Sequence, residues 1–142
     1  MTIRRHTTLF LAFATMGALL QACAPRASGP QTRLFASDFQ GVARTCATPK
    51  PTPISGKTIE ASMRVGSDNG WCGLTVNNGG RPFATELLTA RPAHGKIYVH
   101  GVGNDTRIDY TPDYGYTGAD SFTVQLLPGD ASVHVAVTAV AH

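Results

Sequence analysis

The stretch from Asp109 to Val124, DYTPDYGYTGADSFTV, holds three tyrosines, two glycines and a proline within sixteen residues. Tyr110 follows the alternation of the preceding residues toward a core. Pro112 fixes φ and removes a backbone donor, which only a strand end or an edge strand tolerates. Gly115 and Gly118 allow positive φ in the connection that follows, and Asp120 can accept hydrogen bonds from backbone N–H groups. The stretch therefore predicts the scaffold of a β-rich fold and not an active site.

On both sides of this stretch, apolar residues recur with a period of two, which is typical of half-buried strands. Gly, Asn, Asp and Pro turns separate the segments, and no amphipathic helix is expected in the mature chain. Seven short strands in about 85 residues favour an all-β fold, an antiparallel immunoglobulin-like sandwich. The expected strands are 58–65, 71–76, 83–90, 95–100, 106–110, 121–127 and 132–140.

The segment 91–124 carries the pattern P-x-H-G, then a strand and a turn, then Y-T-P-x-x-G-Y-x-G-x-D-x-F. It resembles the bacterial cadherin-like or tandem-repeat Ig-like module. The resemblance implies the sandwich fold and says nothing of activity, because such modules serve adhesins, enzymes and scaffolds alike. This chain carries one copy and no tandem array. The matching residues are Pro92, His94, Gly95, Tyr110, Thr111, Pro112, Gly115, Tyr116, Gly118, Asp120 and Phe122.

Tyr116 lies just before the strand that Phe122 belongs to. In immunoglobulin-like domains, a tyrosine at such a place bonds its hydroxyl to upstream backbone in a tyrosine corner. We expect Tyr116 to do so here.

The first residues read as an export signal. Arg4 and Arg5 precede an apolar run, Leu9 to Leu20, which is too short to span a bilayer. The run ends in Leu20-Gln21-Ala22-Cys23, which resembles the lipobox of bacterial lipoproteins. The resemblance implies cleavage before Cys23, acylation of Cys23, and, because Ala24 follows, an outer-membrane location facing the periplasm. Ordinary signal cleavage and an uncleaved apolar anchor remain alternatives.

Three cysteines are an odd number for an exported chain. If Cys23 takes the lipid, Cys46 and Cys72 are left to form one disulfide in an oxidising compartment. Two free thiols or a metal pair are the alternatives, although no Cys-x-x-Cys or Cys/His spacing supports a metal.

These segments divide the chain into a signal peptide (1–22), a lipid anchor with a proline-rich tether (23–57) and a sandwich domain (58–142). Without Arg4 and Arg5, the chain has ten basic and nine acidic residues. A net charge near zero and the lack of any Lys/Arg run give no reason to expect nucleic acid.

No nucleophile motif such as G-x-S-x-G occurs, so we expect no catalytic residue. Acidic residues recur around one edge, and both turn chemistry and a calcium site are open for them, turn chemistry being favoured. They are Asp105, Asp109, Asp113 and Asp120. The histidines are not expected to hold a metal, because nothing places two of them together: His94, His100, His134 and His142. No cofactor is expected.

Trp71 alternates with Cys72 and so faces away from the core. It lies either in an exposed binding patch or, as we favour, beneath the linker that a Cys46–Cys72 bond would hold close. The candidate binding face is Trp71, Tyr98, His100, Arg107 and His134.

The sequence thus favours a non-enzymatic, lipid-anchored envelope protein whose Ig-like module binds an envelope protein or a glycan. Its membrane contact is expected through the N-terminal lipid. The alternative is a structural accessory subunit of a larger envelope or secretion assembly, and a small enzyme or metal carrier is the third hypothesis.

Overall fold

The computed structural model describes residues 34–141, which belong to one compact unit that begins at Gln31. The signal peptide, the lipobox and Cys23 lie outside the described residues. In the described part no helix is long and apolar enough to cross a membrane. The elements are η1 (Ala36–Phe39), β1 (Cys46–Ala47), β2 (Thr58–Gly66), β3 (Cys72–Val76), β4 (Thr85–Ala90), β5 (Gly95–Val102), β6 (Asp105–Pro112), β7 (Gly118–Leu127) and β8 (Ala131–Val140).

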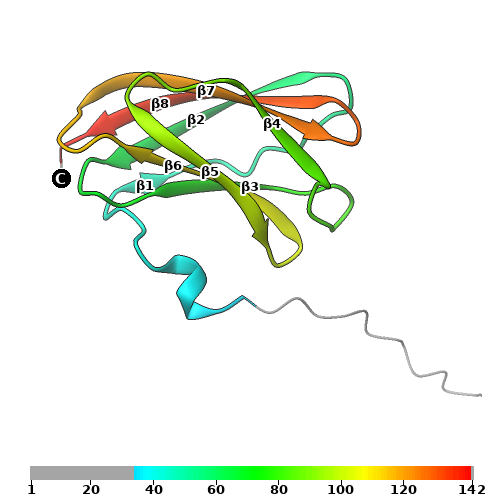
Figure 1. Ribbon diagram of the computed structural model, residues 1–142, viewed down its shortest axis with the longest axis horizontal. Coiled ribbons are helices and arrows are strands. Elements are labelled where there is room, and N and C mark those ends of the chain that lie inside the picture. Colours follow the sequence, from blue (N-terminus) through cyan, green and yellow to red (C-terminus); the bar gives the residue numbers. More distant parts are fainter. Residues whose placement is uncertain (1–33, 142) are drawn as a thin grey trace, which may run out of the picture. The chain divides into compact units, whose positions relative to one another are not determined.

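The strands form two sheets packed face to face, in the orders β1-β2-β8-β7-β4 and β3-β6-β5 (Figure 1). This arrangement confirms the immunoglobulin-like sandwich, and strands β2 to β8 match the seven expected segments to within a few residues. One pair differs from the expected antiparallel pattern, because β2 runs parallel to β8. The reason is that strands β2 to β8 alternate in direction along the chain. The first and the seventh of them, β2 and β8, therefore run the same way and pair as parallel strands.

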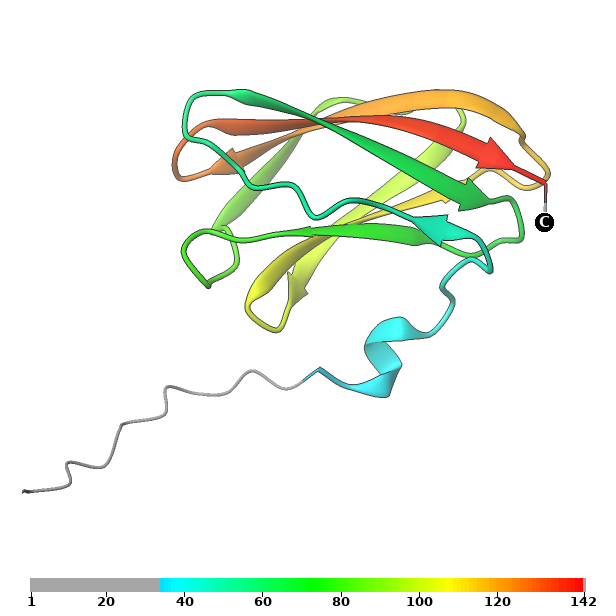
Figure 2. The same cartoon turned by 180° about the vertical axis from the view of Figure 1, so that it is seen from behind.

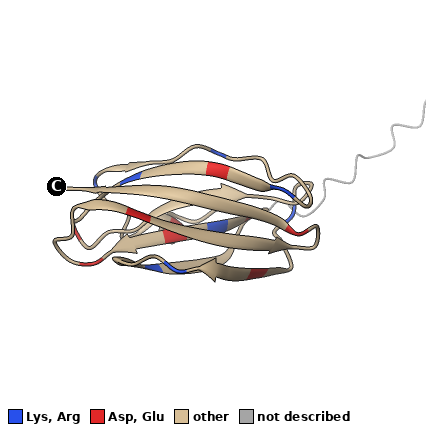
Figure 3. Cartoon of the chain, turned by 90° about the horizontal axis from the view of Figure 1, so that it is seen from above, with Lys and Arg blue, Asp and Glu red and all other residues tan. Residues whose placement is uncertain are grey.

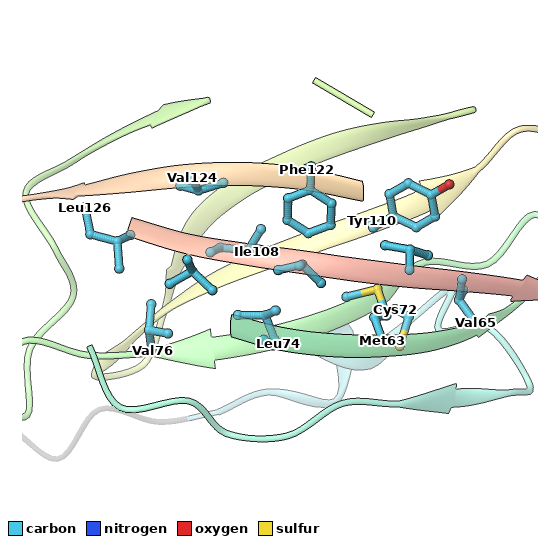
Figure 4. Packing of buried hydrophobic residues seen from close by; sticks show 14 of the residues in the cluster. Met63, Val65, Cys72, Leu74, Val76, Ile108, Tyr110, Phe122, Val124 and Leu126 are labelled. Atoms are coloured by element: carbon cyan, nitrogen blue, oxygen red, sulfur yellow. The ribbon is translucent and has the colours of Figure 1, made fainter. Parts of the chain in front are cut away.

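The core lies between the sheets and is built mainly from alternate residues of β2, β3, β6, β7 and β8 (Figure 4). The inward faces expected for β2, β7 and β8 are buried as predicted. β4 and β5 are the exceptions, because their inward residues Leu88, Ile97 and Val99 are only partly buried. The largest fully buried side chains are Tyr110, Phe122, Met63, Leu74, Ile108 and Leu126, with valines of β2, β3, β7 and β8 around them. This unit therefore has a hydrophobic core of its own, as a domain that folds independently requires.

A disulfide between Cys46 and Cys72 joins β1, at the edge of the larger sheet, to β3, at the edge of the smaller one. Their Cα atoms lie 5.2 Å apart, and they are 26 positions apart in sequence. Closing a loop of that length stabilises the folded state by about 3.5 kcal/mol in the chain-entropy estimate. The bond confirms the expected pairing and closes one side of the sandwich.

The opening stretch forms a latch around the carboxylate of Asp120. The carboxylate accepts the N–H groups of Ala93, His94 and Ser121 at 2.8–2.9 Å. The Tyr110 hydroxyl lies 2.9 Å from Asp120 Oδ2 and 3.1 Å from the His94 carbonyl oxygen. Burial alone would raise the pKa of Asp120, but these donors outweigh it and lower the pKa. The 93–94 turn, the end of β6 and the start of β7 are thereby tied together, as a scaffold requires.

The same latch explains other residues of the motif. Gly95 packs against the ring of Tyr110 so closely that a Cβ there would overlap it. Pro112 ends β6, and Gly118 takes a positive φ of 147°. Tyr116 differs from expectation, because its hydroxyl donates to the downstream Ala119 oxygen at 2.7 Å. The hydroxyl that reaches upstream backbone is that of Tyr110, since Tyr110 is the tyrosine buried inside the sandwich.

Packing also begins earlier in the chain than position 58, the expected start of the domain. β1 pairs with β2, and η1 with the residues after it lies against the smaller sheet. Figure 2 shows this cyan segment on the side of the smaller sheet, ahead of β1.

Candidate functional site

Four of the five residues expected on a binding face come together on the outer surface of the β3–β6–β5 sheet. Cross-strand pairing places His100 beside Arg107 and Tyr98 beside Asp109, while Trp71 stands immediately before β3. The rings of Tyr98 and His100 lie 4.6 Å apart. The sequence-based face is therefore largely assembled by the fold.

His134 does not belong to it. It lies on β8 of the other sheet, where its Nδ1 is 3.0 Å from Thr123 Oγ1 and its Nε2 is 4.0 Å from Glu60. Alternation indicated correctly that His134 points outward, but it carries no information on which sheet a strand joins.

Arg107 and Asp109 form a buried ion pair at the centre of this face. Arg107 Nε lies 2.9 Å from Oδ1 and 3.1 Å from Oδ2 of Asp109. Its N–H is directed at Oδ2, so Oδ2 accepts the hydrogen bond and Oδ1 has no hydrogen-bond partner in the described structure. His100 Nε2 lies 3.1 Å from the same Oδ2.

Gly73 of β3 makes this pair possible. A Cβ at Gly73 would overlap Asp109 Oδ1 and press on the rings and stem of Trp71 and Arg107. Removing one member of a buried ion pair costs about 3–5 kcal/mol, because the other charge is left without a partner. The pair at the centre of the face therefore depends on glycine at position 73.

Residues 34–43, which we call the strap, cover the β3 side of this face. The Trp71 indole Nε1 donates to the Gln40 oxygen at 2.8 Å, and Trp71 exchanges backbone bonds with Gly41 and Ala43 at 2.9 and 2.8 Å. Arg107 stacks on the Trp71 ring, 4.1 Å from its centroid, and donates through Nη1 to the Asp38 carbonyl oxygen. Of the two positions expected for Trp71, the structure has the one beneath the linker.

The opposite side of the sandwich is open. In the described chain β4 pairs only with β7, and β5 pairs only with β6. A groove lies along these two edges, and Tyr98, 65% exposed, stands on the outer face of β5. The residues that line the groove are Leu88, Arg91, Pro92, Gly95, Lys96 and Ile97.

The acidic residues do not converge. Asp109 is committed to Arg107, and Asp120 to the latch, while Asp105 accepts from the Asn77 side chain at 2.8 Å and lies 3.6 Å from Lys50 Nζ. Among residues 34–141 no group of three His, Cys, Asp or Glu side chains could hold a metal ion. Figure 3 shows charges of both signs interspersed along the strands.

Sequence reasoning missed the Arg107–Asp109 pair and the strap. The pair had a signal, because residues i and i+2 of a strand share one face. The strap had none, since its residues lack periodicity and dock mainly through backbone groups.

No protein-family model matches this chain, and no curated protein matches it.

Proposed function

We propose that this chain is a lipid-anchored protein of the bacterial envelope, without enzymatic activity, whose immunoglobulin-like domain binds a protein partner along its open β4–β5 side. The observation that carries the binding part is the asymmetry of the sandwich. One side is closed by β1, the disulfide and the strap, whereas β4 and β5 leave two strand edges free in the described structure.

A free strand edge presents a row of N–H and C=O groups that an extended segment of another protein can pair with. β5 offers such an edge over eight residues, from Gly95 to Val102. Side chains beside it add selectivity: Leu88 and Ile97 are apolar, while Arg91 and Lys96 are basic. An extended peptide with alternating apolar and acidic residues fits this combination.

The polar cluster under the strap supports a binding role more than a catalytic one. The Asp109 carboxylate contacts Arg107 and His100, and its second oxygen, Oδ1, is buried. A general base needs access to the proton that it removes. The cluster instead fixes β5 and β6, and with them the exposed Tyr98.

Site-specific photocrosslinking in cells tests the binding role. A photoreactive residue at position 98 is expected to trap one dominant envelope protein, identified by mass spectrometry after affinity purification. Tyr98→Ala should abolish co-purification of that protein. Tyr114→Ala is the matched control, because Tyr114 is also an exposed tyrosine, 81% accessible, in the loop after β6.

Co-purification, measured with chains that carry no photoreactive residue, that is equally weakened by both variants would contradict binding at the β5 edge. If the crosslink at position 98 captures only glycan, the partner is a saccharide and not a protein. A stoichiometric partner that survives Tyr98→Ala would favour the accessory-subunit alternative. Anchoring is tested separately, by mass spectrometry of the N-terminal peptide for acyl chains on Cys23 and their loss in Cys23→Ser.

A further inference from the structure

Large apolar side chains are exposed on the strap. Leu34, Phe35 and Phe39 are 59%, 61% and 57% accessible, within six residues of the chain. Single exposed apolar residues are ordinary, but a contiguous group marks an interaction surface. Elsewhere in the described chain the exposed large apolar residues are dispersed over separate loops and strands, except Val42, which follows the group.

The way in which the strap is attached leaves these side chains unused. Its hydrogen bonds to the sandwich use backbone groups of Asp38, Gln40, Gly41 and Ala43, and only Ala43 is buried in the core. The Asp38 carboxylate turns back and accepts the Phe35 N–H at 2.7 Å. The strap is therefore fixed to the sandwich while its two phenylalanines remain directed toward whatever lies outside.

The position of the strap in the chain indicates what lies outside. Leu34 is eleven residues after Cys23, so the patch lies within about 40 Å of that cysteine even for a fully extended tether. The intervening residues APRASGPQTR contain Arg26 and Arg33 and no acidic residue. A basic segment followed by aromatic side chains suits the surface of an anionic bilayer, which attracts the arginines and accepts phenylalanine at the level of the headgroups.

We propose that Leu34, Phe35 and Phe39 form a membrane-docking patch that inserts into the surface of an anionic phospholipid bilayer. This inference rests on the lipid anchor of the proposed function, because the anchor brings the patch to the membrane. Insertion gives the chain a second point of attachment to the membrane besides the acylated cysteine and fixes the orientation of the domain. The strap covers the β3 side and the free edge is β5, at the other edge of the same sheet, so both can be occupied together.

The test uses the chain from Ala24 onward, which lacks the acyl chains but contains the whole compact unit. Its partition onto vesicles of phosphatidylethanolamine and phosphatidylglycerol is measured by co-sedimentation, with phosphatidylcholine vesicles for comparison. We expect binding to the anionic vesicles that falls about ten-fold or more in Phe35→Ser/Phe39→Ser. Ile54→Ser/Leu87→Ser, which removes two exposed apolar side chains elsewhere, should bind like the unchanged chain.

Equal losses in both double variants, or no binding to vesicles, would overturn the proposal. A dimer in sedimentation that Phe35→Ser/Phe39→Ser dissociates, without vesicle binding, would assign the patch to a second copy and also overturn it. Urea midpoints of all variants establish that each remains folded. Acylation of Cys23 is measured independently. Vesicle binding without acylation would reject the lipid anchor and leave the docking patch standing. Acylation without vesicle binding would reject the docking patch alone.

Discussion

Replacing Asp120 by alanine removes the centre of the latch at the start of β7. Three backbone N–H groups lose their acceptor, those of Ala93, His94 and Ser121. The Tyr110 hydroxyl keeps the His94 oxygen at 3.1 Å. At about 1 kcal/mol for each water-accessible bond, the variant should lose about 3 kcal/mol of unfolding free energy.

The measurement is urea unfolding of the chain from Ala24 onward at neutral pH, followed by the fluorescence of Trp71, the single tryptophan. With slopes of about 1–3 kcal/mol per molar urea, the midpoint should fall by about 1–3 M. Asp113→Ala is the control, because Asp113 is an exposed carboxylate in the same connection. It should change the unfolding free energy by less than about 0.5 kcal/mol.

Acid adds a second criterion. The folded pKa of Asp120 is lowered, so its contribution is present above the unfolded pKa of about 4 and is lost as pH falls through the folded pKa. The difference between the unchanged chain and Asp120→Ala should therefore shrink below about pH 4. A loss at neutral pH no larger than that of Asp113→Ala would show that the latch does not stabilise the fold.

Further changes probe the disulfide, the buried tyrosine and the close glycine. Cys46→Ser/Cys72→Ser should lower the unfolding free energy by about 3.5 kcal/mol in urea titration, and a change below about 1 kcal/mol would contradict the loop-closure account. Burial, and then the bond to Asp120, raises the pKa of Tyr110 above that of an unfolded tyrosine. The contribution of Tyr110 to the unfolding free energy is therefore fully present below about pH 10 and declines above that pH. Tyr110→Phe should flatten this alkaline decline in unfolding followed by circular dichroism, and an unchanged decline would assign it to other groups. Gly95→Ala should cost about 1–3 kcal/mol by overpacking. Gly101→Ala, on the same strand with only ordinary contacts, should be nearly neutral, so equal melting temperatures of the two variants would argue against crowding at Gly95.

The sequence predicts most of the fold, because alternation indicates burial residue by residue and the motif from Pro92 to Phe122 indicates a scaffold. The partners of Asp120 at positions 93, 94 and 110 come from the structure alone. It does not predict the parallel β2–β8 pair, since pairing partners depend on topology and not on local pattern. In the candidate site, alternation identifies Tyr98, His100 and Arg107 as outward-facing. It misplaces His134, because two sheets share the same period. The strap escapes prediction altogether, as backbone-mediated docking leaves no periodic trace in side chains.

The disulfide also determines how the protein carries mechanical load. Tension applied from the N-terminal side reaches Cys46 and passes through the sulfur–sulfur bond directly to Cys72 at the start of β3. The residues between the two cysteines, which include all of β2, are thereby excluded from the path of the force. The parallel β2–β8 ladder is then not sheared by pulling on the N-terminus, and the covalent bond sets the maximum length to which the N-terminal segment extends.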